Sequence, residues 1–156
     1  MRQQSAIETT PTDSITSPSG KLIVLSVSPM EEDHSSLQSI IHHANAMLFK
    51  ARDLISALNL LHRQEIAIVF CERDLFPGGT WVDMLEHINT LPSAPSLIVT
   101  SRMADDRLWS EVLNRNGWDV LAKPFDPTEV IRSVKSAWQH WLNRTHIPTA
   151  MMKAAS

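Results

Sequence analysis

Short apolar runs alternate along the chain with segments in which apolar residues recur every three or four positions. The short runs are typical of strands, and the three-to-four spacing is typical of helices with one apolar face. The strand-type runs cover residues 22–25, 46–49, 66–71, 97–100 and 120–121. The helical segments cover residues 37–44, 54–61, 81–88, 104–116 and a stretch that begins at residue 127. Five successive strand-helix units predict an α/β protein with a five-stranded, doubly wound parallel sheet.

The last predicted helix has a well-marked start. Asp126 is a favourable N-cap, and Pro127 suits the first helical position, where its missing N–H costs nothing. The apolar stripe of this helix ends in Trp138 and Trp141. We expect both indoles to cover the sheet, and the position of Trp141 near the helix end leaves exposure of that ring open.

The ends of the chain differ in composition from its middle. Residues 1–20 are rich in Ser, Thr, Pro and Gln and hold few large apolar side chains, so we expect a disordered leader there. The helical periodicity fades after residue 142, which predicts a flexible tail over residues 143–156. One globular domain over residues 21–142 is therefore predicted, and 156 residues with 43% hydrophobic content are enough for its core.

Charge and composition exclude several classes of protein. A net charge of -3, without a basic stripe on any predicted helix, argues against direct binding to nucleic acid. No apolar run approaches the roughly 18 residues of a membrane-spanning helix, and the chain does not begin with the apolar core of a signal peptide. Cys71 is the single cysteine, which fits a reducing compartment. These features predict a cytoplasmic protein.

The ends of the fourth and fifth strand-type runs carry the most informative residues. The fourth run ends in Thr100-Ser101, and the fifth ends in Lys123-Pro124-Phe125. In this order the two segments resemble the fourth and fifth strands of the response-regulator receiver family. The resemblance covers about residues 21–142 and implies the strand order 2-1-3-4-5. It also implies that Thr100 and Lys123 occupy the positions that contact a phosphoryl group carried by an aspartate.

In the receiver family that the chain resembles, the phospho-acceptor lies at the end of the third strand. The corresponding segment of this chain reads Cys71-Glu72-Arg73-Asp74. Glu72 directly follows the apolar run and is the better candidate, and Asp74 is the alternative. The family's usual proline four residues after the acceptor does not decide between them, because Pro77 lies five residues after Glu72 and three after Asp74. We expect Lys123 to form a salt bridge with Glu72 that is only partly buried, because both residues end neighbouring parts of one cleft.

The first strand lacks the acidic pair with which phosphorylatable receivers bind Mg²⁺. It ends in Ser26-Val27-Ser28, and acidic side chains follow only at positions 31–33. Negative charge there suits the first turn of a helix. We therefore expect no metal cofactor. The alternative is a Mg²⁺ site with Glu31 and Glu32 as ligands.

The resemblance predicts a non-enzymatic signalling protein of the two-component type. The leading hypothesis is a degenerate receiver that acts through protein contacts, and the alternative is a Mg²⁺-dependent receiver that accepts phosphate on Glu72 or Asp74. The expected partner is a signalling protein, either a histidine kinase or a downstream regulator. Its contact face is expected on the fourth helix, fifth strand and fifth helix, through which a homodimer could also form; the interface residues predicted on this face are Trp109, Trp118, Arg132 and Lys135. The family's aromatic switch position, three residues before the lysine, is Val120.

Overall fold

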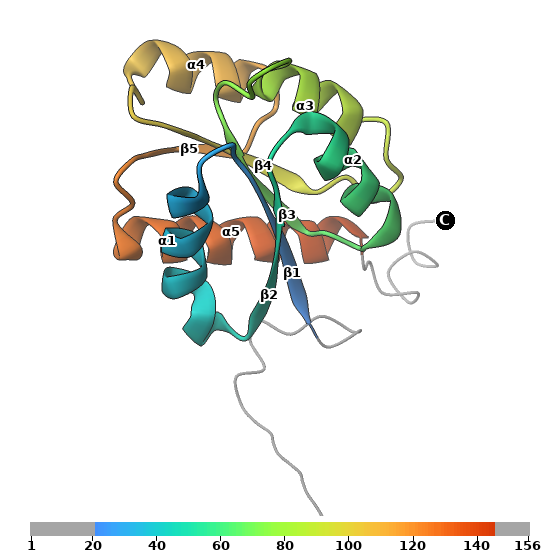
Figure 1. Cartoon of the computed structure of the whole chain (residues 1–156). Helices are drawn as coiled ribbons and strands as arrows, with labels where there is room; N and C mark the ends of the chain where they lie inside the picture. Colours follow the sequence, from blue (N-terminus) through green and yellow to red (C-terminus); the bar gives the residue numbers. More distant parts are fainter. Residues whose placement is uncertain (1–20, 146–156) are drawn as a thin grey trace, which may run out of the picture.

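A computed structural model describes residues 21–145, which form one parallel sheet with helices on both faces (Figure 1). The five strands run in the order β2-β1-β3-β4-β5, and every pairing is parallel. The α/β class, the doubly wound sheet and the strand order 2-1-3-4-5 are therefore confirmed. The elements are β1 (Leu22–Val27), α1 (Glu31–Ile41), a short 3-10 helix (His42–Ala44), β2 (Ala46–Ala51), α2 (Leu54–Arg63), β3 (Ile68–Glu72), α3 (Trp81–Ile88), β4 (Ser96–Ser101), α4 (Asp106–Asn114), β5 (Asp119–Ala122) and α5 (Pro127–Thr145).

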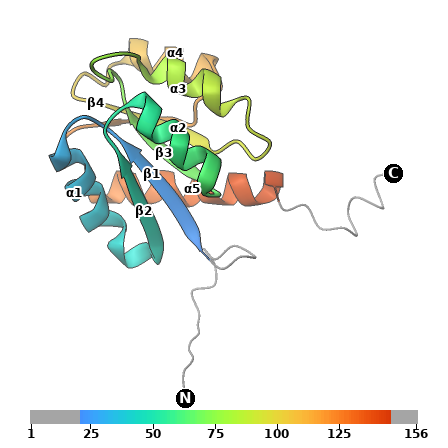
Figure 2. The same cartoon turned by 45° about the vertical axis from the view of Figure 1, so that its right-hand side comes forward.

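The helices form two layers, with α2, α3 and α4 on one face of the sheet and α1 and α5 on the other (Figures 1 and 2). Each layer closes its own apolar cluster against the strands. Every residue of β3 and β4 is buried, as is usual for central strands covered on both faces. Trp138 and Trp141 stack in parallel in the α5 layer with ring centroids 5.5 Å apart. Both cover the sheet as expected, and Trp141 is only 2% exposed although it lies near the end of the apolar stripe.

Side-chain caps fix where several helices begin. The carboxylates of Asp53 and Asp105 accept hydrogen bonds from backbone N–H groups in the first turns of α2 and α4. Thr80 and Asp83 form a reciprocal capping box at the start of α3. Asp126 accepts from the N–H of Thr128 at 3.0 Å, as its predicted role requires. Each cap fixes the first residue of its helix, which leaves a loop between that helix and the strand before it.

Several observed boundaries differ from the sequence prediction. Helix α4 is shorter than the predicted 104–116, because Asp105 caps it and Asn116 takes a left-handed conformation with a φ of 71°. Helix α5 reaches Thr145, three residues beyond the predicted end of the domain, and the Thr145 hydroxyl donates to the Trp141 carbonyl at 2.7 Å. The expected leader over 1–20 and the tail beyond residue 145 lie outside the described residues.

Candidate functional site

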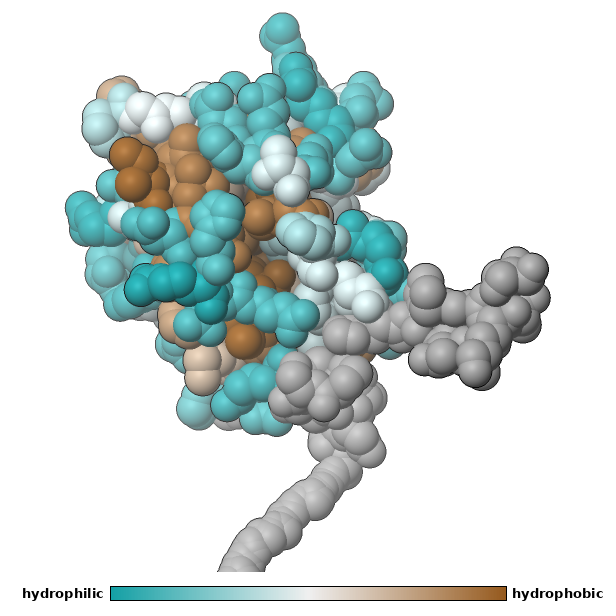
Figure 3. Space-filling model, turned by 90° about the vertical axis from the view of Figure 1, so that its right-hand side faces the viewer, coloured by the Kyte–Doolittle hydropathy of each residue, from teal (hydrophilic) through white to brown (hydrophobic). Residues whose placement is uncertain are grey.

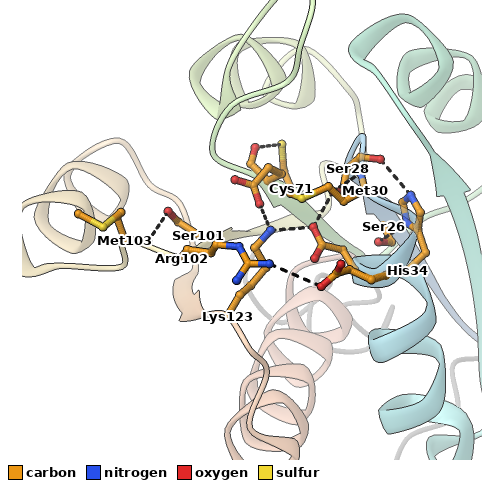
Figure 4. Close-up of polar contacts among 12 residues, drawn as sticks. Ser26, Ser28, Met30, His34, Cys71, Ser101, Arg102, Met103 and Lys123 are labelled. Carbon is orange, nitrogen blue, oxygen red and sulfur yellow. Dashed lines mark hydrogen bonds and ion pairs between the residues drawn. The ribbon is translucent and has the colours of Figure 1, made fainter.

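The Lys123 side chain, which follows β5, ends between two carboxylates at the carboxyl edge of the sheet (Figure 4). Its Nζ donates to Asp33 Oδ2 at 2.8 Å and also to Glu72 Oε1. The Lys123–Glu72 pair is thus present as expected. It is not partly exposed as expected, because the side chains of Lys123, Asp33 and Glu72 are only 3%, 6% and 11% exposed.

Asp33 belongs to the first turn of α1 but points into the site. The Ser28 hydroxyl donates to Asp33 Oδ2 at 2.6 Å, and the N–H of Met30 donates to that same hydroxyl oxygen at 3.1 Å. From the sequence, Asp33 was expected in an acidic helix start and not beside Lys123. A signal was available, because Asp33, Leu37 and Ile41 are four residues apart and share the buried face of α1.

Glu31 and Glu32, the two residues of the alternative Mg²⁺ site, are turned to the surface. Glu31 pairs with Lys50 at 3.2 Å and Glu32 with Arg102 at 3.5 Å, and all four side chains are more than half exposed. Asp33 and Glu72, the buried carboxylates, are already engaged by Lys123. Over residues 21–145, no group of three or more His, Cys, Asp or Glu side chains is placed to hold a metal ion. The arrangement does not fit the expected Mg²⁺ alternative, which needs several free oxygen ligands.

His34 is a buried anchor that the sequence analysis did not single out. Its Nε2 donates to the Ser28 carbonyl at 3.0 Å, so in the neutral ring Nδ1 accepts from the Ser26 hydroxyl at 2.8 Å. Burial away from water lowers the pKa of His34, while the bond to Ser28 and the charges of Glu31 and Asp33 act in the opposite direction. A neutral imidazole therefore ties the first turn of α1 to both serines at the end of β1 (Figure 4).

The structure separates the two candidate acceptor residues. Glu72 is the last residue of β3, is buried, and pairs in register with Thr100 of β4. Asp74 lies two residues beyond the strand, is exposed, and forms an isolated bridge with Thr80. Thr100 is buried beside Glu72, and the backbone N–H of Lys123 donates to the Ser101 carbonyl at 3.1 Å. Glu72, Thr100 and Lys123 therefore belong to one edge, and Asp74 lies outside the buried cluster.

Cys71 lies next to Glu72 but is chemically sheltered. The thiol is buried, and its hydrogen donates to the Glu72 carbonyl at 3.3 Å. Burial, with the nearby Glu72 charge, raises the pKa of the thiol well above its ordinary value. The thiolate that reacts or binds metals is therefore suppressed, as expected for a core cysteine.

The four predicted interface residues are distributed over α4, β5 and α5. Trp109 is half exposed on α4, and Arg132 and Lys135 are exposed on α5. Trp118, just before β5, is partly buried, because its ring stacks on His140 at 4.7 Å and its Nε1 donates to Ser136 at 3.1 Å. Val120 is half-buried in β5. Trp109, Arg132 and Lys135 thus remain accessible to a partner.

A separate hollow lies at the opposite edge of the sheet from Lys123. It has a volume of about 480 Å³ and is bordered by the ends of α3, α4 and α5 and the start of β4. Its polar lining includes Asn89, Asn116, His140 and Arg144. Figure 3 shows the molecule from the side where the carboxyl-terminal end of α5 lies. Apolar residues gather in the middle of this side and are surrounded by hydrophilic residues. The Arg144 guanidinium is already bound to the Ala94 carbonyl.

Comparisons with known proteins identify the fold. No protein-family model matches the chain, and no curated protein matches it in sequence. A signal receiver domain of an HD domain-containing protein from Pseudomonas fluorescens is similar, with 26% identity, a TM-score of 0.69, and coverage of 78% of this chain and 97% of that one. A two-component response regulator from Clostridium difficile has 17% identity, a TM-score of 0.67, and coverage of 76% and 96%.

A CheY-like response regulator receiver domain from Methanospirillum hungatei adds a third match, with 14% identity and a TM-score of 0.70 over 80% of this chain and 99% of that one. The predicted resemblance is confirmed at the level of the fold, which is that of response-regulator receiver domains. Within residues 21–145, no helix is both long and apolar enough to cross a membrane.

Proposed function

We propose that this chain is a receiver-type signalling module of the two-component class that works through protein contacts and does not accept phosphate. The observation that carries the proposal is the buried Lys123 ammonium held between Glu72 and Asp33. A lysine held by two buried carboxylates must give up at least one of these contacts before it can pair fully with an incoming phosphoryl group. The receiver fold supports the two-component class.

Two further features weaken the alternative of a Mg²⁺-dependent receiver that accepts phosphate on Glu72 or Asp74. Glutamate has one more methylene than aspartate, and a displacement of about 1 Å can reduce an in-line transfer on the order of 100-fold. Serines and a valine stand at the end of β1 where an acidic pair would hold the metal. Phosphoryl transfer depends on such a metal to neutralise the developing charge.

The first test is phosphorylation by a small phosphodonor. We expect no phosphoryl group on the purified protein after incubation with acetyl phosphate and Mg²⁺, as measured by intact mass. Glu72→Asp should remain unlabelled, because the Lys123–Asp33 pair and the serines of β1 are unchanged. A phosphorylatable receiver domain serves as the positive control for the reagent. Stoichiometric labelling of the unmodified protein, lost in Glu72→Gln or Asp74→Asn, would establish the alternative function and its acceptor.

The contact surface that we propose is the face formed by α4, β5 and α5. Trp109 offers an exposed indole there, and Arg132 and Lys135 offer positive charge on α5. Aromatic side chains and arginine are enriched in protein interfaces. The face suits a signalling protein as partner, either a histidine kinase or a downstream regulator, and a second copy of the chain could use it to form a homodimer.

Charge reversal tests this face. Arg132→Glu with Lys135→Glu should reduce binding of the natural partner, and any self-association, by at least 10-fold. The two side chains are exposed, so the unfolding midpoint should stay nearly constant. Binding is measured by capture from source-cell extract followed by titration with the identified protein, and self-association by sedimentation. Arg63→Glu, on the exposed side of α2, is the matched control. Unchanged binding in the double variant would place the interface elsewhere.

A further inference from the structure

The buried cluster contains one more negative group than positive groups. Asp33 and Glu72 are carboxylates, Lys123 is the cation between them, and all three side chains are almost inaccessible to water. A carboxylate taken out of water needs a nearby positive charge or several hydrogen bonds. Because one Nζ atom contacts an oxygen of each carboxylate, the ammonium fills the space between them (Figure 4).

The position of the Asp33 carboxylate is fixed by a second hydrogen bond besides the one from Lys123. Ser28 donates to the same Asp33 oxygen that accepts from Lys123, and the backbone N–H of Ser28 donates to the Ala51 carbonyl at 3.0 Å. His34, the next residue of α1, is bound to Ser26 and to the Ser28 carbonyl. The first turn of α1 is thereby tied to the end of β1, and Asp33 is aimed at the end of β5.

We propose that Lys123 is the resident cation of a two-carboxylate pocket and that Asp33 is the positioning residue that holds it there. The tethered ammonium supplies the positive charge that a dissociable metal ion would otherwise have to bring. It also occupies the space that such an ion would need. The pocket is consequently closed to divalent cations as long as Lys123 is present.

Removal of the ammonium should open the pocket to a metal ion. Replacing Lys123 by methionine keeps much of the side-chain volume but leaves Asp33 and Glu72 facing each other across the vacated space. Two carboxylates, the Ser28 hydroxyl and water are ligands of the kind that small, hard divalent cations prefer. The Lys123→Met protein should therefore gain a site for Mn²⁺ or Mg²⁺ that the unmodified protein does not have.

The inference deepens the proposed function, because a resident cation explains a receiver-type site that operates without metal. Its test is separate from the phosphorylation test. The unmodified chain could prove to accept phosphate without metal while the ammonium still excludes divalent ions. Conversely, the metal response could fail while the chain still acts through protein contacts.

The experiment compares three proteins: the unmodified chain, Lys123→Met, and Lys123→Met combined with Asp33→Asn and Glu72→Gln. Thermal unfolding is followed by circular dichroism in increasing Mn²⁺ at constant ionic strength, and bound Mn²⁺ is counted by electron paramagnetic resonance. For Lys123→Met we expect one ion per chain and a saturable rise in the unfolding midpoint. The rise should be roughly 8 °C at a concentration about 100 times the dissociation constant. The other two proteins should show neither effect.

Three outcomes would count against the proposal. A saturable response of the unmodified protein would show that Lys123 does not close the pocket. An equal response of the triple variant would place the metal away from Asp33 and Glu72. If Lys123→Met is unfolded without metal, we expect it to refold when Mn²⁺ is added, and such refolding would support the proposal. Failure to fold or bind in millimolar Mn²⁺ would overturn the proposal.

Discussion

Lys123→Met should lower the free energy of unfolding by about 3–5 kcal/mol in the absence of divalent metal, the largest loss that we expect from a single substitution at the site. The loss comes mainly from the two carboxylate charges that remain in the site, not from the missing ammonium itself. The substitution leaves Asp33 and Glu72 buried without their shared partner. Chemical denaturation with urea measures the loss. Lys135→Met, on the exposed side of α5, is the matched control and should stay within about 0.5 kcal/mol.

A combined substitution separates the ion pairs from simple packing at Lys123. Changing Asp33 to Asn and Glu72 to Gln in the Lys123→Met background removes all three charges while keeping the side-chain shapes. We expect at least half of the lost stability to return, because replacing a buried ion pair as a whole costs much less than removing one partner. If the triple variant is as unstable as Lys123→Met, packing of the lysine stem, rather than its charge, stabilises the cluster.

Gly117→Ala should lower the free energy of unfolding by about 1–3 kcal/mol, because the position has no room for a side chain. A Cβ there would collide with Val112 Cγ1 and lie 3.0 Å from the Val112 carbonyl oxygen. Val112 is fully buried in α4, and its carbonyl accepts the N–H of Gly117 at 2.8 Å. The added methyl group must therefore displace either the core or the turn that leads into β5.

Gly78→Ala is the matched control for this substitution. Gly78 is exposed, and a Cβ at this position would have nothing within 4 Å. The free energy of unfolding of Gly78→Ala should differ from that of the unmodified protein by no more than about 0.5 kcal/mol in the same urea titration. Equal losses for the two alanine variants would mean that backbone freedom, rather than the contact with Val112, explains the effect at Gly117.

The order of strands and helices along the chain was predictable because each element has its own local pattern of apolar residues. Unbroken apolar runs correspond to strands that are buried on both faces, and three-to-four spacing corresponds to helices that cover them. Parallel strands place their carboxyl ends at one edge of the sheet, so Glu72 and Lys123 could be expected to meet there. Helix limits were less certain, since the ends of α4 and α5 depend on Asn116 and Thr145 in their final surroundings.

Local patterns predicted the sheet and two of the three charged groups at the site, and the family resemblance predicted the strand order. The third charged group, Asp33, joins them only through the packing of the folded chain. Asp33 and Lys123 are 90 residues apart, and their contact requires α1 to pack on the sheet with its Asp33–Leu37–Ile41 face inward. Burial of the cluster also depends on that packing, because a side chain loses water only when other elements close over it. Local patterns cannot encode such closure, and for this reason the ion pair that was expected to be only partly buried is almost fully buried.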